Sequence, residues 1–117
     1  MDLNRSVFKT FPPDSPKEIE ARLRRRYLDR LGHRVKKLRK LLIERNWEDL
    51  RSECGQLANS GETFGFQNIT SLALVAQESI PAGRVSRAAT PAHAKESTEA
   101  LIGAIDETLI EYSVSRA

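Results

Sequence analysis

The feature that most constrains the fold of this chain is a stripe of apolar and small residues within residues 47–64. Its members follow one another at steps of three and four: Trp47, Leu50, Cys54, Leu57, Gly61 and Phe64. That spacing places them on one face of an α-helix. Asn46 can cap the helix start, and Gly65 can end the helix in the left-handed conformation, with Phe66 packing back on the last turn. We therefore predict a helix over 47–64 with one buried face.

A long amphipathic segment precedes this helix. Ser15 followed by Pro16 is typical of a helix start, and Glu18 is placed to complete a capping box. The apolar stripe comprises Ile19, Leu23, Tyr27 or Leu28, Leu31, Val35, Leu38 and Leu42. The segment is either one helix over 16–45 or two helices broken at Leu31 and Gly32. We expect a bend or break near Gly32.

Two further stripes follow the central helix. The first begins at Gln67 or Asn68 and comprises Ile69, Leu72, Ala73, Ala76 and Ile80. Residues 81–90 lack periodicity and predict a connector. Thr90 followed by Pro91 repeats the signal for a helix start, and the final helix is expected to continue to about Ser115. Its stripe comprises Thr98, Leu101, Ile102, Ile105, Leu109 and Tyr112.

These segments predict an all-α fold, because no segment alternates polar and apolar residues as a strand does. Four amphipathic helices with short connections indicate one domain, an antiparallel four-helix bundle over 15–117. Residues 1–14 are expected to form an extended arm, since Pro12 and Pro13 oppose a helix there. Either the arm is loose or its Phe8 and Phe11 pack over the bundle, and we favour packing because exposure of both rings is unfavourable. No apolar run approaches the length of about 20 residues that spans a membrane. The single cysteine is compatible with a cytoplasmic location.

The stretch over 46–66 resembles the core of histidine-phosphotransfer (HPt) domains. The opening of that family matches at Asn46, Trp47 and Glu48, and its aromatic-glycine-aromatic close matches at Phe64, Gly65 and Phe66. Between them, Cys54 matches the small residue before the phosphorylated histidine, and Leu57 matches the apolar residue after it. The resemblance implies a four-helix bundle with a phosphotransfer site on the central helix.

The resemblance also implies that the phosphotransfer site itself is lost. The phosphorylated histidine of the family falls on Gly55, its lysine on Ala58 and its glycine on Asn59. Gly55 has no nucleophile, and Ala58 supplies no cation for phosphoryl charge. Asn59 would crowd the space that the family leaves for the phosphoryl group. Gly55 itself has two explanations: drift after the histidine was lost, or close approach of a partner backbone.

No other group in the sequence replaces the missing acceptor. His33 lies near Gly32, and His93 is expected in the first turn of the last helix, so neither lies on the central helix. Cys54 belongs to the apolar stripe and is expected to be a core residue. With one cysteine and two separated histidines, we expect no metal site, no cofactor and no enzymatic activity.

The charge distribution favours an acidic partner for the first helical region. Residues 17–45 carry twelve Lys/Arg against four Asp/Glu, in a chain whose net charge is +3. The leading hypothesis is a non-catalytic HPt-like module that binds a receiver or histidine-kinase domain without carrying phosphate. The alternatives are an HPt scaffold that regulates other proteins outside phosphorelays and a basic bundle that binds nucleic acid. The expected partner surface is the face of the central helix beside the stripe: Arg51, Ser52, Gly55, Ala58, Asn59 and Glu62.

Overall fold

The computed structural model describes residues 15–83 and 90–116, and within these ranges it contains four helices and no strand. The helices are α2 (Pro16–Ile43), α3 (Trp47–Phe64), α4 (Gln67–Glu78) and α5 (Ala94–Arg116). The predicted all-α fold is confirmed. The predicted arm over 1–14 and the part of the connector over 84–89 lie outside the described residues.

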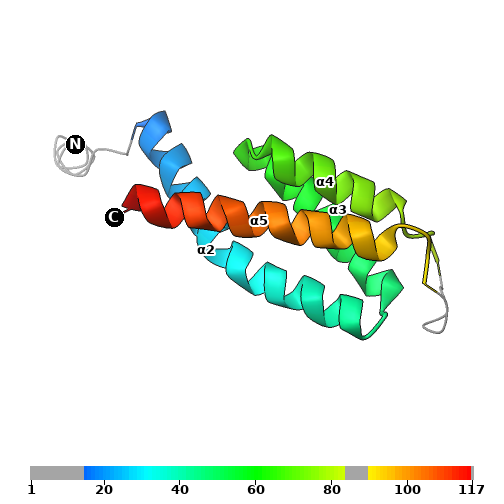
Figure 1. Cartoon of the computed structure of the whole chain (residues 1–117). Coiled ribbons are helices and arrows are strands. Elements are labelled where there is room, and N and C mark those ends of the chain that lie inside the picture. The colour runs from blue at the N-terminus through cyan, green and yellow to red at the C-terminus, as the bar shows by residue number, and fades with distance from the viewer. Residues whose placement is uncertain (1–14, 84–89, 117) are drawn as a thin grey trace, which may run out of the picture.

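The four helices form a closed ring in which α2 and α4 each contact α3 and α5 (Figure 1). Two contacts fix the direction of α5 against α2. The Tyr112 hydroxyl lies 3.3 Å from Asp29 Oδ1, and Arg39 Nη2 lies 2.8 Å from Asp106 Oδ2. Residue numbers rise along α2 as they fall along α5, so these two helices run antiparallel. The short turn at Gly65 and Phe66 makes α3 and α4 antiparallel as well.

The ends of α2 and α3 carry the caps that the sequence predicts. Ser15 Oγ accepts a hydrogen bond from the Glu18 amide, and Asn46 Oδ1 accepts one from the Asp49 amide. Gly65 has a φ of 79°, and the Phe66 amide donates to the Gly61 carbonyl at 2.7 Å. This is the Schellman geometry, which satisfies carbonyls left without partners at the end of a helix.

The prediction near Gly32 was a bend or a break, and the break is wrong, because α2 is one continuous helix through that residue. The residues Leu31, Val35 and Leu38 on either side of Gly32 are almost fully buried. Burial of this stripe outweighs the cost of about 1 kcal/mol that a glycine imposes on a helix interior.

The first two turns of α2 extend past the helices against which the rest of α2 packs (Figure 1). Ile19 and Leu23, predicted to be core residues, are 42% and 44% exposed. Support for α2 begins at Arg24, whose guanidinium carbon lies 4.8 Å from the centre of the Phe66 ring. Next to it, Tyr27 stacks on Phe64 at 4.9 Å between ring centres. The predicted stripe is therefore correct as a helical pattern, but its first two members have no partner helix among the described residues.

The core of the described residues confirms the remaining stripes. On α3, Trp47 is 2% exposed, and every other predicted stripe residue is buried except the half-buried Phe64. Near the end of α2, the predicted stripe residue Leu42 is only half-buried, and its neighbour Leu41 is buried instead. The large apolar side chains that are fully buried outside α3 come from α2, α4 and α5 and from the residue Ile80 just beyond α4. They are Leu31, Leu38, Ile69, Ile80, Leu101 and Ile105.

The last helix begins later than predicted, at Ala94 rather than at Thr90 and Pro91. The Ala94 amide donates to the Pro91 carbonyl, which closes a turn, and His93 has a φ of 66°. A positive φ is incompatible with a right-handed helix, so His93 precedes α5.

No described helix is long and apolar enough to cross a membrane.

Candidate functional site

The position at which the HPt resemblance expects a histidine, Gly55, lies on α3 beneath a side chain of α4. A Cβ placed on Gly55 would lie 2.8 Å from Nε2 of Gln77 and 3.4 Å from its Cδ. The Gln77 amide therefore occupies the space that a side chain at residue 55 would need. Both residues are half-buried, so the pair lies at the surface of the contact between α3 and α4.

The six residues of the predicted partner surface divide into two groups. Ser52, Asn59 and Glu62 are exposed, as predicted. Arg51 is half-buried, and its Nε donates a hydrogen bond of 3.0 Å to the Ile80 carbonyl just beyond the end of α4. Arg51 thus helps to hold α4 against α3, because its cationic side chain satisfies a carbonyl left free at a helix end.

The prediction that Ala58 belongs to an open surface is wrong, since this residue is only 3% exposed. Its carbonyl accepts a hydrogen bond of 3.3 Å from Thr70 Oγ1 of α4. The approach of α4 is close at this level because Gly61, one turn further along α3, has no side chain: a Cβ there would lie 2.6 Å from Thr70 Oγ1. Position 58, which holds lysine in the family, is thus part of the core.

The only thiol near residue 55 belongs to the preceding residue, and it is not reactive. Cys54 is fully buried, and burial raises the pKa of its thiol to about 12. Because the thiolate is the reactive form, Cys54 is protonated at neutral pH and closed to reagents. Its prediction as a core residue is confirmed.

Neither histidine lies on α3, the helix that carries Gly55. His33 is exposed on α2. His93, predicted to lie in the first turn of the last helix, instead precedes α5, where its Nδ1 lies 3.6 Å from Glu96 Oε2. In the part of the chain that the structure describes, no three His, Cys, Asp or Glu side chains are grouped to hold a metal ion.

Three residues near the predicted surface were missed by the sequence analysis. Gln77 covers Gly55, and Leu74 lies one turn earlier on the same face of α4 with 44% of its surface exposed. Glu53 is 3% exposed, and its carboxylate lies 2.8 Å from Arg34 Nη1 and 3.2 Å from Lys37 Nζ of α2. Glu53 follows Leu50 by three residues and precedes Leu57 by four, so its place on the apolar stripe was the available signal.

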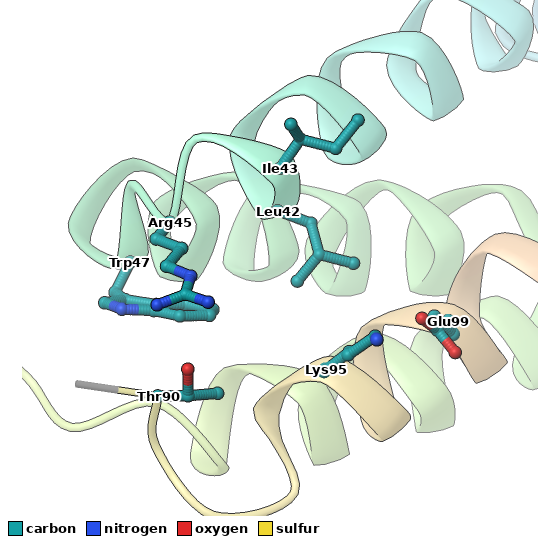
Figure 2. Close-up of a pocket in the computed structure, with 7 residues that line it drawn as sticks. All are labelled: Leu42, Ile43, Arg45, Trp47, Thr90, Lys95 and Glu99. Atoms are coloured by element: carbon teal, nitrogen blue, oxygen red, sulfur yellow. The ribbon is translucent and has the colours of Figure 1, made fainter. Parts of the chain in front are cut away.

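A pocket of about 300 Å³ lies at the far end of the bundle, where α2 turns into α3 (Figure 2). Its cations are Arg45 and Lys95, and its carboxylate is Glu99. Lys95 and Glu99 are one turn apart on α5, so part of the positive charge is balanced locally.

No protein-family model, curated protein or solved structure matches this chain.

Proposed function

We propose that this protein is a non-catalytic docking module that binds a receiver or histidine-kinase domain in two-component signalling without carrying phosphate. The observation that carries the proposal is the state of residue 55. It falls where the HPt resemblance places the acceptor, it is half-buried on α3 and has no nucleophile, and the Gln77 amide fills the space above it. The HPt resemblance supplies the class of partner.

The docking surface in this proposal is centred on Gly55 and Gln77. Exposed Ser52 and Asn59 border it on α3, and Leu74 adds an exposed apolar side chain on α4. An apolar residue surrounded by small polar groups is the usual composition of a transient protein interface. We call this set of five residues the α3–α4 face.

The charge next to this face suits an acidic partner. Arg34 Nη1 lies 3.3 Å from Gln56 Oε1, one turn along α3 from Ser52. Arg34 and Lys37 share the carboxylate of Glu53, and 60% of the Lys37 side chain remains exposed. Receiver domains, by the resemblance, present an acidic pocket to HPt domains. A basic border would accelerate association with such a partner, and the association rate would fall as salt screens the charges.

The test is binding of the full chain to a panel of receiver and histidine-kinase domains, measured by titration with the wild type and two glycine variants. Gly55→Trp places a large side chain at the centre of the α3–α4 face and should weaken binding about tenfold or more, equivalent to about 1.4 kcal/mol. Gly103→Trp is the matched control, because Gly103 is exposed on α5 and a Cβ placed on it would meet no atom within 4 Å. It should bind as the wild type does.

Phosphotransfer in the same panel separates docking from catalysis. The wild-type chain should take no acid-labile label from a phosphorylated receiver, because residue 55 has no side-chain nucleophile. Binding that survives Gly55→Trp would place the partner on another surface. Acid-labile label that disappears on replacing His33 or His93 would contradict the non-catalytic function.

The basic surface of α2 supports a second candidate function, binding of nucleic acid. Arg25, Arg26, Arg30, Lys36 and Lys40 are exposed along this helix. Against it, Arg39 is paired with Asp106, and Arg24 lies on Phe66. Fluorescence anisotropy with labelled RNA and DNA at physiological salt distinguishes the two functions, since charge-driven binding would fall steeply with added salt and would not respond to Gly55→Trp.

A further inference from the structure

The exposed start of α2 is a basic amphipathic helix without a partner among the described residues. Ile19 and Leu23 lie one turn apart and are 42% and 44% exposed. Arg26 and Arg30, three and seven residues after Leu23, continue the same helix face and are exposed too. We call these four residues the α2 stripe.

A groove of about 530 Å³ between α4 and α5 has the opposite character. Its apolar lining includes Leu72 and Val75 of α4 and Ala100 of α5, and Val75 is 53% exposed. Two carboxylates, Glu78 and Glu96, also line it, and both are exposed. We call this the α4–α5 groove.

These two surfaces lie at opposite ends of the bundle (Figure 1). The α2 stripe begins before Arg24, which contacts Phe66 at the start of α4. The α4–α5 groove lies near the other end of α4, at Glu78 and Ser79, beside the start of α5. The first turns of α2 therefore cannot reach the groove of their own chain, but those of a second copy can.

We propose that the protein associates head to tail, with the α2 stripe of one copy seated in the α4–α5 groove of the next. Ile19 and Leu23 would pack on Leu72 and Val75, and Arg26 and Arg30 would lie near Glu78 and Glu96. Apolar contact supplies the attraction, and the two pairs of opposite charges set the orientation. Such a contact joins unlike surfaces, so it builds rings or open chains rather than a symmetric dimer. The proposal does not rest on the proposed function, since it uses neither Gly55 nor Gln77.

The test measures the mass of the full chain in solution by sedimentation velocity over a wide concentration range. The wild type should grow in mass with concentration, and added salt should weaken that growth without abolishing it, because it screens only the charge pairs. Leu23→Asp damages the α2 stripe, because it sets a carboxylate against the apolar lining at Leu72 and Val75. Val75→Asp damages the α4–α5 groove by placing a charge in its apolar lining. Each variant alone should stay a monomer at every concentration.

Mixing the two variants is the decisive measurement. Leu23→Asp retains an intact groove and Val75→Asp an intact stripe, so an equal mixture should form a species of twice the monomer mass and nothing larger. In that species the stripe and the groove that remain unoccupied each carry an Asp. These two surfaces repel each other, which prevents further growth. Ile110→Asp is the matched control: Ile110 is 63% exposed on α5, outside both surfaces, and its variant should associate as the wild type does.

Helix content by circular dichroism verifies that each variant folds, as expected for changes at exposed positions. A wild-type mass that does not vary with concentration overturns the proposal. So does a mixture that remains monomeric, because complementation is required of any head-to-tail contact. Loss of association in Ile110→Asp would place the contact elsewhere on the chain.

Discussion

The two sides of α3 are held to their neighbours by opposite means. On the α2 side, Glu53 brings a nearly buried carboxylate between Arg34 and Lys37, at 2.8 and 3.2 Å. On the α4 side, the contact depends on side chains that are absent or small, since a Cβ on Gly61 would lie 2.6 Å from Thr70 Oγ1 and 3.2 Å from its backbone nitrogen. One side needs a specific charge and the other needs empty space.

This difference separates two glycines that look alike in the sequence. Gly61 faces backbone atoms of the α3–α4 turn and of α4, which cannot move without moving the helix. Gly55 faces only the end of the flexible Gln77 side chain. Helix packing therefore requires glycine at residue 61 but not at residue 55, which leaves drift or a docking partner as the reason for Gly55.

The largest effect should come from the core shared by both sides of α3. Trp47 begins the helix and is 2% exposed. Trp47→Ala should lower the free energy of unfolding by about 3–5 kcal/mol, because it removes a large buried side chain and leaves a cavity. Urea denaturation followed by circular dichroism measures the change. Ile43→Ala is the control: Ile43 is 81% exposed, and its variant should keep the wild-type midpoint.

The next effect tests the empty space on the α4 side. Gly61→Ala should lower the free energy of unfolding by about 1–3 kcal/mol, although alanine is the better helix former, because its methyl group would force α4 away from α3. The same denaturation experiment applies. A stabilised Gly61→Ala variant would mean that α4 shifts freely and that the tight contact at Thr70 carries no energy.

The charge on the α2 side should contribute less. Glu53→Gln keeps the shape of the side chain but removes the charge that faces Arg34 and Lys37, and should cost about 1–2 kcal/mol. Asp106→Asn, which weakens the exposed pair with Arg39, is the matched control and should cost about 0–1 kcal/mol. Equal losses in the two variants would show that burial of Glu53 adds nothing to its ion pairs.

The sequence predicted the features that depend on periodicity and on caps. The α3 stripe, its Asn46 cap and its Gly65 end all follow from local residue patterns, and the structure confirms each of them. Periodicity identifies an apolar face but does not say whether a neighbouring helix reaches it. Ile19 and Leu23 were misassigned to the core for that reason, because α2 is longer than its partners there.

The candidate site was less predictable, because it depends on how two helices align. Gly55 was identified from the family pattern alone, but the pattern contains nothing that assigns Gln77, 22 positions later, to the space above it. Ala58 was placed on an open surface because one buried stripe was assumed. Since α3 contacts both α2 and α4, its buried arc is wider than one stripe and includes this residue.

The smallest predicted effect has the opposite sign and completes the comparison between the two glycines. Gly55→Ala should raise the free energy of unfolding by up to about 1 kcal/mol, because alanine stabilises a helix interior and the Gln77 amide can rotate away. If the Gln77 side chain still crowds the new methyl group, adding Gln77→Ala should restore the gain in the free energy of unfolding. Glycine to alanine would then stabilise the protein at residue 55 and destabilise it at residue 61. If Gly55→Ala is destabilising even with Gln77→Ala, the backbone of α4 and not the Gln77 side chain limits residue 55, and Gly55 would be a packing glycine rather than part of a docking surface.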